Sequence, residues 1–300
     1  MSTTTTPRIP TQRGPAPAPP PPRREPNPLL RWLLFGVGAA VVWSLINTDV
    51  GVRSLIQGRD GAARLLEGLF PPDLDGTLLS RVGTAIIETL QISIAALVLG
   101  AVIGLPLAAL MAGNVQAPGW LSGGARAIAT TLRGVPELLW ALLFVATVGL
   151  GPAAGVYAIT LHAAGLIAKL CSEQLEAVDS APVEAMRLTG ASRTATALLA
   201  IFPQARANIA SQLLYQWECN IRSFVIIGFV GAGGIGQALG ISMNLFRYQE
   251  MATLLIAVLI LVIGVDRISR AFRAHLGAAS HNPTPTLTTR FRQLLTRRKS

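Results

Sequence analysis

The chain has 300 residues, of which 51% are hydrophobic and 13% are charged, and its mean hydropathy is +0.51. A soluble domain carries about 25% charged residues, so this composition excludes an ordinary soluble enzyme and predicts a protein of the lipid bilayer. The net charge is +10, but the basic residues flank apolar runs and form no compact patch, which argues against nucleic-acid binding.

The N-terminal 28 residues are rich in Thr, Pro and Arg and hold few apolar side chains. Such a segment cannot bury enough apolar surface to offset its loss of conformational entropy, so we expect a disordered tail over residues 1–28. Its polyproline character leaves open a site for a proline-recognising domain, although a passive tail is the favoured interpretation.

The first predicted spanning helix covers residues 29–46 and carries a tryptophan near each end, where interfacial aromatic side chains belong. A polar external connection over 47–81 follows it. Within this connection, residues 52–70 form an amphipathic piece that suits a membrane surface. The second span, over 82–112, is longer than a bilayer requires, which predicts a tilted or protruding helix.

Four further spans are predicted after residue 125, separated by polar or Gly-rich segments. The third ends near residue 148, and the others cover residues 153–170, 208–230 and 251–265. The longest polar interruption is an insert over 172–205. We assign residues 82–270 to one core domain with this insert as its coupling segment, and residues 271–300 to a basic tail.

Lysine and arginine are distributed unequally between the predicted loops. If the N-terminus lies in the cytoplasm, most of the 25 basic residues fall on the cytoplasmic side, and Arg222 lies within the membrane. The positive-inside rule then predicts six spans with both termini in the cytoplasm of a cell that has this protein in its inner membrane. The same rule places the polar insert in the cytoplasm.

The sequence shows no motif for chemistry of its own. Its two lysines, Lys169 and Lys299, do not follow the spacing of a nucleotide-binding P-loop, and no Cys/His pair has metal-ligand spacing. We therefore expect no ATP hydrolysis by this chain, no metal and no cofactor. His162 lies inside a span and is interpreted as a packing residue, with a proton relay as the alternative.

Residues 231–236 match G-x-G-x-x-G after an apolar run. A dinucleotide site needs that run to be a strand of a βαβ unit, with an acidic residue about 20 positions further on. The run is instead a whole span, and Glu250 comes too early. The glycines, with Gly233 and Gly234 among them, predict close helix packing or a broken helix that lines a path.

Glu218 and Arg222 lie four residues apart in the predicted fifth span and share a helical face with Ser211 and Tyr215. A charge at this depth costs about 2.5–3.5 kcal/mol on insertion scales, so these groups must pair or face a watery cavity. Two interpretations stay open. The pair locks helices together, or the stripe lines a pathway in which Arg222, paired with Glu218 at rest, neutralises an anion.

The polar insert contains a short predicted helix. Asp179 and the following Pro182 are typical of an N-cap and the first helical turn. Glu184 is expected in that first turn, where the helix dipole favours an acid. Gly190 is expected to end the helix, and Pro203 to break the next one before the membrane.

This segment resembles the signature of ABC importer permeases, which is Glu-Ala-Ala, then Gly, then Ile-x-Leu-Pro at fixed spacing. Four residues are in register: Glu184, Ala185, Gly190 and Pro203. Three positions depart from the signature and keep apolar residues: Met186, Ala200 and Phe202. The resemblance implies a coupling helix that docks in a groove of an ATPase subunit, with Glu184 to Gly190, including Ala185 and Met186, as the docking part.

More of the chain is similar to one subfamily, the permeases of phosphonate importers. The similar pieces cover most of residues 80–270 in order: 133–137, 149–152, 169–179, 218–222 and 231–237. The resemblance implies an all-α bundle of six transmembrane helices of the type I ABC importer class. It also implies a homodimer, two copies of an ATP-binding subunit and an external binding protein for phosphonates, phosphite or phosphate.

We therefore expect a permease subunit that is not itself an enzyme and that imports a phosphorus oxyanion. Its expected pathway residues are Ser211, Tyr215, Glu218, Arg222, Gly233 and Gly234. The rival class is a proton-coupled secondary transporter. That class predicts an inverted internal repeat, which we do not find between residues 29–148 and 153–265.

Overall fold

The computed structural model describes residues 28–47, 59, 61, 63 and 65–276. The chain divides into two units, residues 1–63 and 64–300, and each is described by itself. In the first unit, helix α1 (Pro28–Asn47) has nearly the bounds predicted for the first span. The predicted tail 1–28, save its last residue, and the basic tail beyond residue 276 lie outside the described residues, as does most of the connection between α1 and residue 65.

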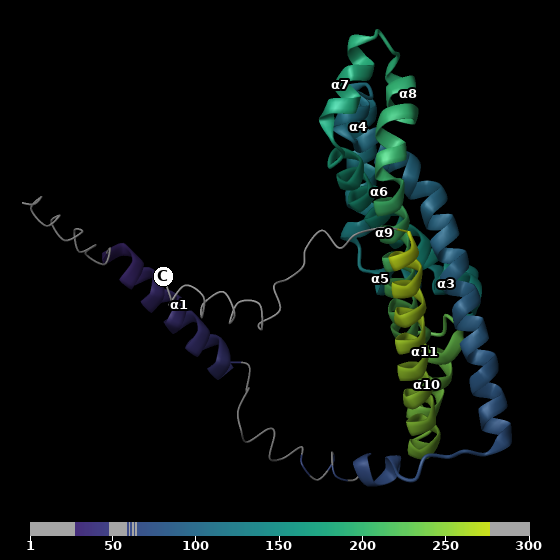
Figure 1. Ribbon diagram of the computed structural model, residues 1–300. Helices are drawn as coiled ribbons and strands as arrows, with labels where there is room; N and C mark the ends of the chain where they lie inside the picture. The colour runs from purple at the N-terminus through teal and green to yellow at the C-terminus, as the bar shows by residue number, and fades with distance from the viewer. Residues whose placement is uncertain (1–27, 48–58, 60, 62, 64, 277–300) are drawn as a thin grey trace, which may run out of the picture. The chain divides into compact units, whose positions relative to one another are not determined.

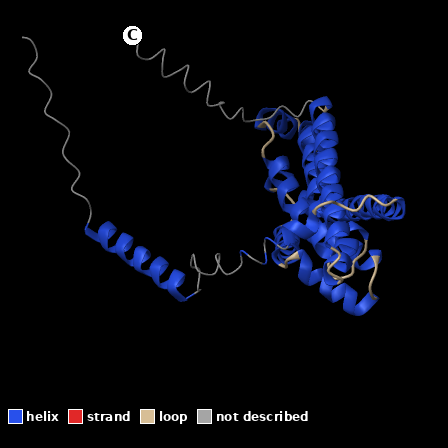
Figure 2. Cartoon of the chain, turned by 90° about the horizontal axis from the view of Figure 1, so that it is seen from below, coloured by secondary structure: helices blue, strands red, loops and turns tan. Residues whose placement is uncertain are grey.

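In the part of the second unit that the structure describes, every regular element is a helix, as Figure 2 shows in blue. The elements in chain order are α3 (Gly76–Met111), η1 (Gly113–Val115), α4 (Gly119–Gly134), α5 (Glu137–Val148), α6 (Pro152–Glu176), α7 (Ser180–Leu188), α8 (Arg193–Thr196), η2 (Ala197–Ile201), α9 (Phe202–Gly228), α10 (Gly234–Asn244) and α11 (Tyr248–His275). The all-α class predicted from the sequence is confirmed.

Among the described residues, three helices are long and apolar enough to cross a membrane: α3, α6 and α11. Helices α4 and α5 meet the same criterion only as a pair, which bends by 84° at the break between them. The predicted count of six spans is therefore not confirmed. The break follows from Pro136, which lacks an N–H group and disfavours helical geometry at Val135 before it.

Helix α6 lies at the centre of this unit and packs against α3, α4, α5 and α9. Its contacts depend on small residues. A Cβ added to Gly104 of α3 would lie 2.8 Å from the carbonyl oxygen of Ala164, and one added to Gly165 would lie 2.6 Å from the backbone nitrogen of Arg133. Such close approach of backbones gives dispersion contacts that hold helices together in lipid, where apolar burial alone drives little association.

The unit has two ends that matter for function (Figure 1). At one end lie α7 and α8, with η1 in contact with α8, and we call this the α7 end. At the other end lie the start of α3, helix α10 and the loop from α10 to α11, and we call this the α10 end. Helix α9 leads from the α7 end toward α10, which it contacts along with α3, α6 and α11.

Candidate functional site

Helix α7 is the short helix predicted inside the polar insert. The Asp179 side chain accepts a hydrogen bond of 3.0 Å from the backbone nitrogen of Ala181, so the predicted N-cap is confirmed. Gly190 follows the helix with φ of +80°, a left-handed conformation that glycine adopts most readily. The prediction that Glu184 lies in the first turn is wrong, because α7 already begins at Ser180.

The two faces of α7 differ in burial. Val183 is buried, and Met186 packs half-buried against the core. Glu184 and Ala185 are exposed, and Leu188 is 89% exposed. Met186 and Val183 thus anchor the helix, and the side chains of Glu184, Ala185 and Leu188 lie on its exposed side. Leu188 was not among the residues predicted from the sequence, and its exposure is visible only in the structure.

Pro203 does not break a helix. Helices α8, η2 and α9 follow one another without a non-helical residue, and Figure 1 shows α8 continuing toward α9. The five residues of η2 form a π-helix directly before Phe202 and Pro203. A π-turn shifts the hydrogen-bond register, and so it accommodates the proline ring and the missing N–H group at the start of α9. The end of the coupling segment is therefore joined to α9 by one continuous helix.

Glu218 pairs with a residue of another helix. Its Oε1 atom lies 2.7 Å from Nη2 of Arg273 in α11, and the two side chains are 11% and 22% exposed. Arg222 instead donates to Sγ of Cys219 over 3.4 Å on its own helix. The predicted pair of Glu218 with Arg222 is therefore wrong.

Arg222 lines a cavity of about 260 Å³ between α9 and α11, together with Glu218 and Asp266. Asp266 pairs with Arg270 over 2.5 Å, and Glu218 pairs with Arg273. Each carboxylate of this cavity thus has its own arginine. Arg222 is left as the surplus cation, and it is exposed on the surface of the described protomer.

The other predicted pathway residues differ in environment. Ser211 is half-buried and Tyr215 is 45% exposed, on the same helix as Arg222. Gly233 and Gly234 are buried, with φ of +95° and +64°. A Cβ on Gly233 would lie 2.9 Å from Oε1 of Glu88, so these glycines permit a tight turn against α3 and do not line an open surface.

The chain matches one family model over residues 104–278, that of the binding-protein-dependent transport system inner membrane component. This chain belongs to that family. The permease is 37% identical over 243 residues to the phosphite transport system permease protein PtxC of Stutzerimonas stutzeri, which covers 81% of this chain and 87% of the relative. It is 34% identical to the phosphate-import permease protein PhnE of Mycolicibacterium smegmatis over 78% of this chain and 44% of the relative.

Solved structures agree on the fold of the permease. An inward-facing structure of the MetNI methionine ABC transporter matches with a TM-score of 0.61 at 23% identity, over 68% of this chain and 99% of that chain. An amino acid ABC transporter with histidines matches with a TM-score of 0.56 at 20% identity, over 68% and 99% of the two chains. The permease thus has the fold of type I ABC importer permeases and is a multi-pass membrane protein.

A polar cluster that was not predicted from the sequence joins three helices of the permease at the α4–α5 break. Nε2 of His162 lies 3.4 Å from Oε2 of Glu137, and the Ser223 hydroxyl donates to Oε1 of Glu137 over 3.0 Å. Nδ1 of His162 lies 3.1 Å from the Val135 carbonyl oxygen. Both ring nitrogens of His162 thus have a polar partner. Glu137, the first residue after a proline in a predicted span, was the available signal.

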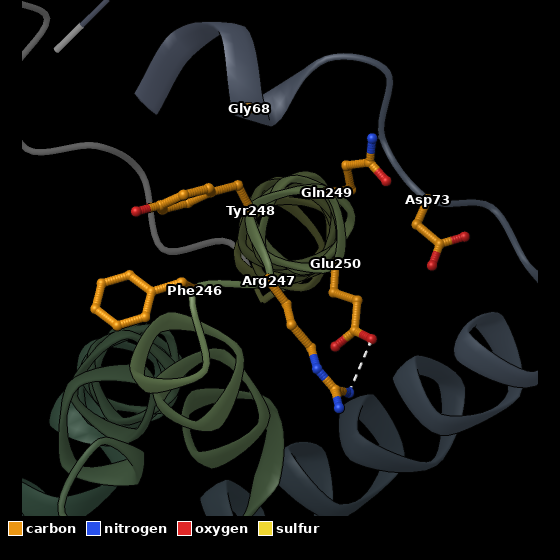
Figure 3. A pocket seen from close by; sticks show the side chains of 7 residues that line it. All are labelled: Gly68, Asp73, Phe246, Arg247, Tyr248, Gln249 and Glu250. Atoms are coloured by element: carbon orange, nitrogen blue, oxygen red, sulfur yellow. Dashed lines mark hydrogen bonds and ion pairs between the residues drawn. The ribbon is translucent and has the colours of Figure 1, made fainter. Parts of the chain in front are cut away.

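A second cavity, of about 380 Å³, lies at the α10 end (Figure 3). It is lined by Gly68, by Asp73 and by residues 246–250. Arg247 and Glu250 form an ion pair of 3.1 Å within it, marked by the dashed line in Figure 3. The loop positions these groups because Phe246 adopts φ of +55° between α10 and α11. In the part of the permease that the structure describes, no group of His, Cys, Asp and Glu has the arrangement of a metal site.

Proposed function

We propose that the permease is the membrane-spanning subunit of an ATP-driven importer for phosphonates or the related oxyanions phosphite and phosphate. The relatives named for phosphite and phosphate transport support this substrate class. The observation that carries the proposal is the continuous helix from the coupling segment to Arg222. A displacement of α8, which follows the turn after α7, can reach the surplus cation without crossing a further loop.

Energy enters at α7, and ATP is hydrolysed by a partner subunit present in two copies. Glu184, Ala185, Leu188 and Gly190 form the docking surface, and all four are exposed. Met186 holds the helix to the bundle from its inner face. The α7 end lies in the cytoplasm in this proposal, with both termini on that side and the α10 end toward the external binding protein.

The substrate passes along the face of α9 that carries Ser211, Tyr215 and Arg222. Two permease protomers bring two such faces together in a homodimer. A dianion that leaves water needs compensating charge, and Arg222 supplies it because the neighbouring carboxylates are already paired. Glu218 forms an ion pair with Arg273, and because its carboxylate is engaged there, it does not neutralise Arg222. The buried Gly233 and Gly234 set the turn at the other end of α9.

The test is reconstitution. The permease, its ATPase and its binding protein are purified in mild detergent and placed in vesicles. We expect the ATPase to co-elute with the permease, and phosphonate-loaded binding protein to stimulate both ATP hydrolysis and uptake. Competition by phosphite and phosphate ranks the three anions. Uptake that needs no ATP and collapses with a protonophore would overturn the proposal in favour of proton coupling.

A further inference from the structure

The loop between α3 and α4 is fastened to the coupling segment by two arginines. Nη2 of Arg187, in the last turn of α7, donates to the carbonyl oxygen of Asn114 over 2.8 Å. Nη1 of Arg193, the first residue of α8, donates to the carbonyl oxygen of Gln116 over 3.2 Å. Guanidinium donors make charge-assisted bonds, which are stronger than bonds between neutral groups. The loop is thus held on both sides of the turn at the tip of the coupling segment.

The end of α6 holds the same loop. Oε1 of Glu176 accepts from the backbone nitrogen of Gly113 over 2.8 Å, and Nδ2 of Asn114 donates to the carbonyl oxygen of Leu175 over 2.6 Å. The last residues of α6 begin the coupling segment, α7 lies in its middle, and α8 lies in its second half. The loop therefore contacts the coupling segment at its beginning, its middle and its end, and is positioned to move with it.

Apolar packing supports these polar contacts. Val115 of the loop, Val178 before α7 and Met186 of α7 all pack against one core cluster. That cluster includes buried Val183 of α7 and Leu175 of α6. The loop and the coupling helix thus share an apolar base, over which the arginine contacts lie on the exposed side. An element packed and bonded in this way moves as one body with its neighbour.

We propose that Arg187 and Arg193 are positioning residues that fasten the α3–α4 loop to the coupling helix. A displacement of α7 by the ATPase then moves α3 and α4 together with α9. This inference rests on the proposed function of α7. It adds a second route for the motion, because α4 leads into the bent α4–α5 pair while α9 carries Arg222.

The first test measures the anion imported per ATP hydrolysed by vesicles that contain the full complex, with methylphosphonate or phosphate as the probe. Arg187→Ala combined with Arg193→Ala should lower this ratio by tenfold or more, where tenfold corresponds to about 1.4 kcal/mol. Lysine at both positions should restore part of it. Arg206→Ala removes an exposed arginine of α9 that makes no such contact and should leave the ratio unchanged.

A second test separates fastening from docking, since Arg187 is exposed near the docking surface. In a background with Cys171→Ala and Cys219→Ala, the pair Asn114→Cys and Arg187→Cys is joined by a short bifunctional thiol reagent. The tether should restore the number of anions imported per ATP hydrolysed, and reductive cleavage of the tether should lower this number again. Failure of the tether to restore coupling, with the ATPase still bound, would mean that Arg187 acts on the partner and would overturn the inference.

The conformation of Gln116 offers a third readout, because its φ of +58° orients the carbonyl that Arg193 meets. Gln116→Gly keeps this conformation and should retain coupling, whereas the β-branched Gln116→Val disfavours it and should match Arg193→Ala. If the wild-type complex imports the probe and the double arginine variant keeps its ratio, the inference is wrong and the proposed function stands. If the wild-type complex does not import, the proposed function itself fails.

Discussion

Glu218 of α9 and Arg273 of α11 form an interhelical ion pair, with Oε1 and Nη2 separated by 2.7 Å. The pair joins the helix that continues from the coupling segment to the last helix of the permease. Because Glu218 pairs with Arg273, Arg222, which is closer to it in the sequence, has no carboxylate partner among the described residues.

The first prediction concerns this ion pair. Arg273→Ala should destabilise the permease by about 1–3 kcal/mol, because it leaves a largely buried carboxylate unpaired. Thermal unfolding in detergent, followed by thiol-reactive fluorescence, measures the change. The double variant Glu218→Gln with Arg273→Met should recover most of the loss. Equal destabilisation by the single and double variants would show that the charge pair is not the cause.

Arg222 is predicted to act on transport and not on folding. Arg222→Ala should lower anion uptake by tenfold or more, which corresponds to about 1.4 kcal/mol of lost charge compensation. The melting temperature and the yield of the assembled complex should stay near wild type, because Arg222 is exposed in the protomer. Uptake by the Arg222→Lys protein should lie between that of the wild type and that of Arg222→Ala. Undiminished transport by Arg222→Ala would exclude this residue from the pathway.

Leu188 is predicted to be an anchor for the ATPase subunit. Leu188→Ser should leave the permease as stable as wild type, since the side chain is 89% exposed. Its affinity for the ATPase should fall by roughly tenfold or more, because burying a leucine side chain contributes about 1.5–3 kcal/mol. Co-elution at a series of ATPase concentrations gives the affinity. Val183→Ser, on the buried face of α7, is the opposite control and should lower stability.

Gly190 is predicted to be required for the shape of the coupling segment. Its φ of +80° costs a non-glycine residue roughly 1–2 kcal/mol, although a Cβ there meets nothing within 4 Å. Gly190→Ala should therefore weaken coupling through backbone strain, and Gly190→Asn should do so less, because asparagine tolerates this conformation better. ATP-driven uptake that is retained by Gly190→Trp would contradict the docking of this segment.

Glycine packing between α9 and α10 gives a prediction on stability alone. A Cβ on Gly228 would lie 2.6 Å from Cα of Gly236, so Gly228→Ala should destabilise the permease by about 1–3 kcal/mol. Gly264→Ala is the matched control, because this helical glycine of α11 meets nothing within 4 Å. The control should be neutral or slightly stabilising, since alanine favours a helix by about 0.5–1 kcal/mol. Equal melting temperatures for both variants would contradict the packing argument.

Local signals predicted local structure well. The N-cap at Asp179, the glycine after α7 and the bounds of α1 each depend on residues adjacent in the chain. Pro203 was misjudged because its effect depends on the preceding turn. The π-helix of η2 takes up the proline, whereas an ordinary α-helical turn would not. The predicted count of six spans is not confirmed, and α9 is not among the described helices that are long and apolar enough to cross a membrane.

The sequence by itself determined that this chain is an all-helical membrane protein with a permease signature, because hydropathy, charge distribution and signature spacing are properties of the chain alone. Only the tertiary structure decided which groups meet. The partner of Glu218 is in α11, the cluster of Glu137 joins three helices, and the arginines of the coupling segment reach a loop that precedes α4. Such contacts form between helices that pack side by side, and nothing in the local sequence specifies that neighbour.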